Sequence, residues 1–171
     1  DVLNALKAAG VTPKWVQVGN EIRSGMLWDE DAALSGASYD VRECDVKGSN
    51  STSEEVKYRE NFANLAAFIN VGYDAVKSVF DDAIVIVHLD NGYDNELYTW
   101  FFDELRANGG KWDMIGMSLY PYWTMLEHKE YTADRTITEC IANINSVARK
   151  YNCDVMVVET LSLIHIRRCR R

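Results

Sequence analysis

The chain has 171 residues, of which 47% are hydrophobic and 11% aromatic, a composition typical of one globular domain or of part of one. Its formal net charge of −8 excludes nucleic acid as an expected partner, because a polyanion is normally bound by a basic surface. The longest apolar stretch, residues 83–89, is much shorter than the roughly 20 residues that cross a bilayer, so no membrane partner is expected.

The two ends of the chain are unlike those of a natural secreted protein. Asp1 opens directly onto a helical pattern that stops at Gly10, so we expect a fragment that begins after its signal peptide. At the other end, the basic sequence RRCRR follows an apolar run in an otherwise acidic chain. We therefore predict one partial domain over residues 1–160 and a foreign or chimeric tail over residues 161–171.

Beyond the first helical pattern, short apolar runs alternate with longer amphipathic stretches. Each apolar run is rich in Val, Ile or Met and has the length of a strand. In chain order we predict a strand over residues 15–20, a helix over about 54–80, a strand over 83–89, a helix over about 95–107, a strand over 114–119, a helix over about 134–151 and a strand over 155–159. In the last helix, the expected buried stripe is Ile137, Ile141, Ile144 and Val147.

Strands that alternate with helices predict an α/β fold built on a parallel sheet. A doubly wound open sheet and a (β/α)8 barrel both fit this pattern. The sequence has neither a GxGxxG nor a GxxxxGK[ST] loop, which removes the main support for a nucleotide-binding open sheet. Four strand–helix units are about half of a barrel, which usually takes about 250 residues, and we therefore predict a partial TIM (β/α)8 barrel.

Two glutamates stand where such a barrel would place its chemistry. Glu21 follows the first predicted strand and Glu159 ends the last one, so both should project from the same end of the sheet. Hydrolysis of a glycoside needs one carboxyl group to protonate the leaving oxygen and a second to attack the anomeric carbon or to activate water. The pair meets that requirement, but ordinary polar residues often end strands, so the positions alone do not decide for a glycosidase.

Aromatic residues in the predicted loops strengthen this interpretation. Sugars bind by stacking their apolar faces on aromatic rings while their hydroxyls form hydrogen bonds at the edges. Rings packed beneath long loops would be the alternative. The aromatic residues in or near loops that follow strands are Trp28, Tyr93, Trp100, Tyr120, Tyr122 and Trp123.

Four motifs carry a resemblance to a known family. They are WVQVGNEIRSGMLW (15–28), HLDNGYD (88–94), DMIGMSLYPYW (113–123) and VMVVET (155–160). In order and spacing they resemble the endo-β-1,4-galactanases of glycoside hydrolase family 53 across residues 1–160, whereas the tail does not. The resemblance implies about strands four to seven of the eight, with Glu21 as the general acid/base and Glu159 as the nucleophile.

The same resemblance implies a set of substrate-binding residues. Asn20 would bond the 2-hydroxyl of the sugar, and Tyr120 would hold Glu159 by its phenol. Trp28 and Trp123 would be sugar platforms. The full implied set is Asn20, Trp28, His88, Asp90, Asn91, Tyr120 and Trp123. No metal ligand is among them, and a calcium site like that of some relatives would fall in loops beyond Thr160.

The implied function is endo-acting, retaining hydrolysis of β-1,4-galactosidic bonds in galactan or arabinogalactan side chains of pectin. We expect a secreted enzyme, a monomer when full length, that uses no cofactor and has its two carboxyl groups about 5–5.5 Å apart. Another β-glycanase, such as a mannanase or β-1,4-glucanase, remains open, as do an inactive carbohydrate-binding fragment and an unrelated α/β protein. We expect residues 1–171 alone to be inactive. Four cysteines, Cys44, Cys140, Cys153 and Cys169, permit three complete disulfide pairings, of which the sequence favours none.

Overall fold

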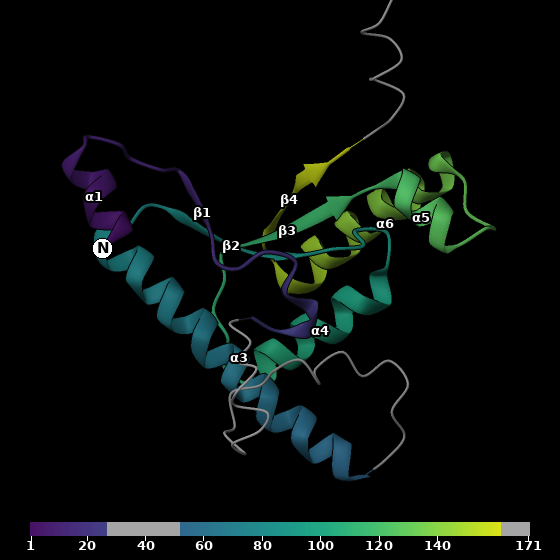
Figure 1. The fold of residues 1–171 in the computed structure, drawn as a ribbon, viewed down its shortest axis with the longest axis horizontal. Helices are drawn as coiled ribbons and strands as arrows, with labels where there is room; N and C mark the ends of the chain where they lie inside the picture. The colour runs from purple at the N-terminus through teal and green to yellow at the C-terminus, as the bar shows by residue number, and fades with distance from the viewer. Residues whose placement is uncertain (27–51, 162–171) are drawn as a thin grey trace, which may run out of the picture.

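The computed structural model describes residues 1–26 and 52–161, with side chains described for residues 1–26 and 62–161. Its centre is a four-stranded, fully parallel sheet in the order β1-β2-β3-β4 (Figure 1). A doubly wound sheet reverses its strand order, whereas a barrel keeps neighbours in chain order. The predicted partial barrel is therefore confirmed. The strands are β1 (Trp15–Gln17), β2 (Ile84–Leu89), β3 (Met114–Leu119) and β4 (Asp154–Thr160).

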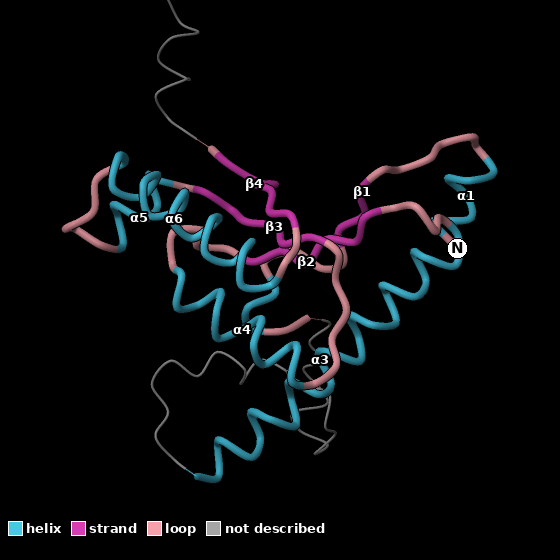
Figure 2. The backbone as a smooth tube through the Cα atoms, turned by 180° about the vertical axis from the view of Figure 1, so that it is seen from behind, coloured by secondary structure: helices cyan, strands magenta, loops and turns pink. Residues whose placement is uncertain are grey.

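A helix precedes the sheet, and a long helix connects each strand to the next. Figure 2 shows α3 and α4 together on one side of the strands. The short helix α5 follows β3, where the sequence was read as a loop, because Pro121 supplies the fixed φ that suits a first helical turn. The helices are α1 (Val2–Ala8), the 3-10 turn η1 (Ile22–Ser24), α3 (Thr52–Val79), α4 (Asn95–Ala107), α5 (Pro121–Glu127) and α6 (Ala133–Tyr151).

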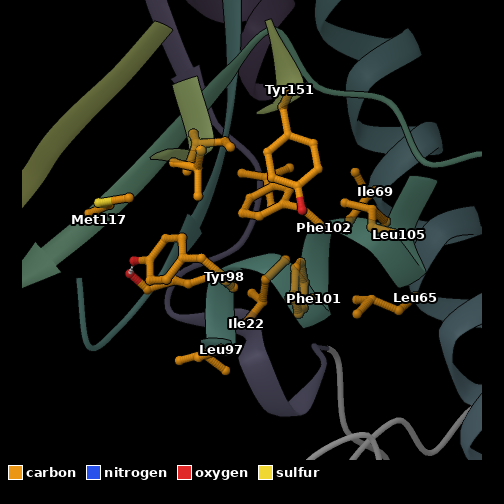
Figure 3. Close-up of a cluster of buried hydrophobic side chains, with 14 of the residues drawn as sticks. Ile22, Leu65, Ile69, Leu97, Tyr98, Phe101, Phe102, Leu105, Met117 and Tyr151 are labelled. Atoms are coloured by element: carbon orange, nitrogen blue, oxygen red, sulfur yellow. Dashed lines mark hydrogen bonds between the residues drawn. The ribbon is translucent and has the colours of Figure 1, made fainter. Parts of the chain in front are cut away.

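The main hydrophobic core lies between the helices and the two central strands (Figure 3). Aromatic rings of α4 dominate it, and Phe101 meets Phe62 of α3 edge-on at 5.4 Å. Tyr98 is fully buried there, and its hydroxyl donates a hydrogen bond of 2.8 Å to the carbonyl of Leu89 at the end of β2. This core fixes the end of β2, from which the loop toward α4 departs.

We expect Tyr98→Phe to lower the free energy of unfolding by about 1–3 kcal/mol, because the buried Leu89 carbonyl would lose its side-chain partner while the ring stays in place. Urea unfolding of the chain measures the change. Tyr122→Phe on the exposed surface of α5 is the control, with an expected effect within about 0.5 kcal/mol. Equal midpoints for the two variants would contradict a contribution of this bond to stability.

The buried face of α6 differs from the predicted stripe. Ile137 and Ile141 are 39% and 55% exposed, whereas Thr136 and Asn143 are buried. Both polar side chains are satisfied in the core, since Thr136 donates to the Thr132 carbonyl at 3.0 Å and Asn143 to the Gly92 carbonyl at 2.8 Å. The prediction is therefore confirmed for Val147, which is buried, and for Ile144, which packs against the core, but not for the two exposed isoleucines. Paired polar groups are buried in their place.

The outer strands of the sheet are more exposed than the inner ones. Trp15 of β1 is 46% exposed and Val157 of β4 is 36% exposed, whereas β2 and β3 are buried along most of their length. No helix in the described part of the chain is long and apolar enough to span a bilayer. Cys140 and Cys153 are free thiols, and Cys44 and Cys169 lie outside the described residues.

Candidate active site

Three side chains from three different strands meet at the carboxyl end of the sheet. Glu21 follows β1, His88 lies in β2 and Glu159 lies near the end of β4. One carboxylate oxygen of each glutamate and one ring nitrogen of His88 lie within 4.8 Å of one another. The two glutamates predicted from strand ends are thus brought together.

The backbone turns sharply after β1 to present Glu21. Gly19 has a φ of 80°, and Glu21 itself adopts the left-handed conformation with a φ of 49°. For a residue other than glycine this conformation costs about 1–3 kcal/mol of strain, which the surrounding structure must offset. The adjacent Ile22 is only 1% exposed within the core, and this burial anchors the turn. The carboxylate is therefore held by a rigid turn rather than by a free loop.

A β-bulge places Glu159. Met117 pairs with Val157, but the next residue, Ser118, pairs with Glu159, so that Val158 is an extra residue in β4. In a regular strand, side chains alternate between faces, and Glu159 would share the face of Val157. The bulge breaks the alternation and re-aims the glutamate, as bulges beside functional sites do. Glu159 thus lies on the same face as Ser118.

Hydrogen bonds from β3 reach both glutamates. The Ser118 hydroxyl donates to Oε1 of Glu21 at 2.6 Å and lies 2.8 Å from Nε2 of His88. Tyr120 donates to Glu159. Burial, together with the bond to Glu159 and its charge, raises the pKa of Tyr120 to about 12. The phenol is therefore a permanent donor at neutral pH.

His88 is the most deeply buried of the described residues in the predicted site, with a side chain that is 0% exposed. Burial lowers its pKa from the usual histidine value, and the charges of Glu21 and Glu159 oppose that shift without reversing it. His88 is therefore a neutral imidazole under the two glutamates at neutral pH.

The structure describes most of the other predicted binding residues. Asn20 is exposed and accepts a hydrogen bond of 3.1 Å from Gln17. Asp90 forms an ion pair with Arg23 at 3.3 Å, and Asn91 takes the left-handed conformation with a φ of 50°. Trp123 is 52% exposed on α5, as a platform would be. The structure leaves their contact with substrate as a prediction.

Two of the predicted aromatic residues need comment. Trp100 lies in α4, inside the helix predicted over residues 95–107, and packs edge-on against Phe62 at 5.5 Å. It therefore packs against the hydrophobic core. Trp28 lies outside the described residues, and its role as a platform stays a prediction.

Sequence reasoning missed Ser118 and Arg23. Ser118 is a small polar residue inside an apolar strand, 1% exposed, and the signal that could have found it is that a buried hydroxyl must have a partner. Arg23 follows Glu21 closely and was read as part of a loop. Only the tertiary arrangement places it against Asp90 beyond β2.

The two glutamates and His88 could in principle bind a metal ion, but their side chains already form hydrogen bonds with neighbouring residues. Two carboxylates and an imidazole are a donor set that a divalent cation can use. Here, Ser118 bonds both Glu21 and His88, and Tyr120 bonds Glu159. These internal bonds favour a hydrogen-bonded carboxylate pair over a cation site.

A carboxylate pair at the strand ends of a partial (β/α)8 barrel defines the class of barrel glycoside hydrolases. The family model for glycosyl hydrolase family 53 matches residues 1–166, and the chain belongs to that family.

The relatives agree with this assignment. The chain is 37% identical over 160 residues to an uncharacterized protein in the bgaB 5'region of Niallia circulans, covering 94% of this chain and 36% of the relative. It is 26% identical over 166 residues to an arabinogalactan endo-beta-1,4-galactanase of Thermothelomyces thermophilus, a match that covers 94% of this chain and 40% of the relative. The chain thus spans between a third and a half of the length of these curated relatives.

Solved structures give the same fold. A structure from a study of two fungal beta-1,4-galactanases matches with a TM-score of 0.65 and 27% identity, covering 94% of this chain and 40% of that one. The family 53 catalytic domain of Ignisphaera aggregans matches with a TM-score of 0.64 and 24% identity, covering 92% of this chain and 34% of that one. This second match supports the fold alone.

Proposed function

We propose that the chain forms the catalytic part of an endo-β-1,4-galactanase that hydrolyses galactan or arabinogalactan, including the side chains of pectin, with retention of configuration. The observation that carries the proposal is the approach of the Glu21 and Glu159 carboxylate oxygens to within 4.8 Å of each other. Galactanase names among the relatives support the substrate class. Because such polysaccharides are too large to enter a cell, the enzyme acts outside it.

The spacing of the carboxylates favours the retaining mechanism. Retaining glycosidases hold their two carboxyl groups about 5–5.5 Å apart, and inverting ones about 6.5–9.5 Å apart to make room for a water molecule. Glu159 attacks the anomeric carbon while Glu21 protonates the departing oxygen. Water then hydrolyses the glycosyl-enzyme, with Glu21 now acting as the base. These steps need no metal or organic cofactor.

The neighbouring residues take supporting roles in this mechanism. Tyr120 keeps the Glu159 carboxylate oriented for attack and donates a bond that stabilises its charge. Asn20, exposed beside Glu21, bonds the sugar 2-hydroxyl, and this contact strengthens in the transition state. Trp123, with Trp28, supplies apolar rings for stacking against neighbouring sugar units.

The test requires a complete barrel, because the chain spans 36% of the Niallia circulans relative. In the grafted barrel, residues 1–160 replace the matching segment of that relative, so that both glutamates come from this chain. We expect hydrolysis of β-1,4-galactan with a β-configured first product, observed by NMR. Activity on mannan or β-1,4-glucan instead would identify another β-glycanase. Binding without hydrolysis by a folded graft would identify a carbohydrate-binding protein.

We expect Tyr120→Phe to lower kcat/KM of the grafted barrel by about 10- to 150-fold, the usual value of one hydrogen bond to a charged group. Because the pKa of Tyr120 is about 12, the phenol stays protonated and its loss should add no new limb to the pH profile below pH 10. Kinetics from pH 4 to 10 check both points. Tyr122→Phe on the same segment is the control, and equal effects of the two changes would contradict the assigned role.

A further inference from the structure

The geometry points to a buried positioning relay of hydrogen bonds, in which His88 orients the Ser118 hydroxyl and Ser118 donates to Oε1 of Glu21. Because Oε1 is occupied by this bond, Oε2 of Glu21 carries the catalytic proton. This inference rests on the proposed role of Glu21 as the general acid/base. It assigns to Ser118 and His88 a function that neither the strand pattern nor the resemblance gave them. Both are positioning residues, since neither touches the reacting atoms.

The direction of the relay follows from counting protons. A serine hydroxyl has a single proton, and that of Ser118 is donated to Oε1 of Glu21 at 2.6 Å. Its second contact, at 2.8 Å to Nε2 of His88, must therefore be one in which the serine oxygen accepts. His88 then carries its proton on Nε2. The chain of donors runs from His88 through Ser118 to Glu21.

The burial of His88 supports this tautomer. The ring is 0% exposed, and its Nδ1 has no hydrogen-bond partner among the described residues. A proton on Nδ1 would be a buried donor without an acceptor, which costs more than a bare ring nitrogen. Burial also lowers the pKa of His88, which keeps the ring neutral. The relay therefore holds protons in place and does not pass them on.

The sheet is built to hold the relay. His88 pairs with Gly116 across β2 and β3, and Ser118 lies two residues further along β3 on the same face. A Cβ at Gly116 would lie 3.2 Å from the Cβ of His88 and 2.8 Å from Cγ2 of Ile86, so a larger residue there would crowd the side chain of His88. Gly92 donates to the Ser118 carbonyl at 2.8 Å, which ties the serine backbone to the loop after β2.

The consequence concerns which carboxyl oxygen does the chemistry. In both protonation states of Glu21, Oε1 accepts the Ser118 hydrogen bond, so the proton that moves during the reaction sits on Oε2. In the first step that proton goes from Oε2 to the glycosidic oxygen, and in the second step Oε2 takes a proton from water. The protons of Ser118 and His88 do not move. A fixed site for the mobile proton keeps the acid aligned, and misalignment of a catalytic group is costly.

The kinetic test compares Ser118→Ala with Ser118→Thr in the grafted barrel. Alanine removes the donor, and we expect a 10- to 100-fold loss of kcat/KM on galactan but less than a threefold loss on an activated aryl galactoside, whose leaving group needs no acid. Threonine keeps the hydroxyl, so Ser118→Thr should retain most of the wild-type kcat/KM on galactan. The control is Thr136→Val, which removes a buried hydroxyl of α6 that bonds only locally.

The difference between the two substrates is the readout that a purely structural role would not move, because only departure of a poor leaving group needs the acid. Equal losses on galactan and aryl galactoside would overturn the positioning role.

A substrate-free measurement separates this inference from the proposed function. Nitrogen-15 NMR of the imidazoles, with His88→Gln to assign the signal, should show a neutral ring protonated on Nε2 at pH 7. A ring protonated on Nδ1, or an imidazolium at that pH, would overturn the relay whatever the enzyme hydrolyses. If the grafted barrel lacks galactanase activity while the Nε2 proton is observed, the proposed function fails and the hydrogen-bonded relay stands.

Discussion

Replacing Glu159 by glutamine should abolish galactan hydrolysis in the grafted barrel, with kcat lower by on the order of 10⁴- to 10⁶-fold. An amide cannot attack the anomeric carbon to form the glycosyl-enzyme. Glutamine has almost the same shape and still accepts a hydrogen bond from Tyr120, so the site should otherwise persist. Steady-state kinetics on galactan measure the loss, and mass spectrometry with a fluorinated galactoside measures labelling of the nucleophile.

The wild-type graft should be labelled on the peptide that contains Glu159, and the variant should not be labelled. Glu104→Gln on α4 is the matched control, because it makes the same chemical change on a helix away from the strand ends. Turnover of the Glu159 variant within tenfold of the wild type would exclude Glu159 as the nucleophile. Labelling of a different carboxylate would identify the residue to which that role belongs.

Replacing Glu21 by glutamine should have a large effect that depends on the substrate. On galactan we expect a loss of about 10²- to 10⁴-fold, the usual contribution of general acid catalysis. On an aryl galactoside with a good leaving group, formation of the glycosyl-enzyme should persist, because departure needs no proton. The second step, which needs Glu21 as a base, should then limit the rate, and an initial burst of the aryl alcohol should appear.

Azide provides the sharper test of Glu21. It is a nucleophile that needs no general base, so it should restore turnover of the aryl galactoside and yield a β-galactosyl azide. The Glu104→Gln control should show neither the burst nor the rescue. Equal losses on both substrates, with no response to azide, would contradict the role of Glu21 as acid/base and would leave it as a structural residue.

Much of the fold was predictable because it depends on local patterns. The four strands and the long helices follow from apolar runs and helical spacing, and α4 (Asn95–Ala107) has the predicted bounds. The buried face of α6 was not predictable in the same way. Thr136 and Asn143 are buried because carbonyls of Thr132 and Gly92 accept their hydrogen bonds, and one of those partners is distant in sequence.

The candidate site was predictable only in part. Glu21 and Glu159 stand at strand ends, and parallel strands bring their ends together, so their meeting follows from topology. The bulge beside Glu159 could not be foreseen, since the run VMVVE reads equally well as a regular strand. The burial of His88 is likewise a tertiary property, because a histidine at a strand end can point either to solvent or to the core.

The continuity of the catalytic strands has a consequence for how such enzymes diversify. Glu21 follows β1, Ser118 and Tyr120 lie in and directly after β3, and Glu159 lies in β4, so the glutamates and the residues that bond them come from one stretch of sequence. A recombination event outside that stretch would leave every one of these bonds intact. The chemistry would then be inherited as one segment, together with the proposed sugar contacts of Asn20 and Trp123.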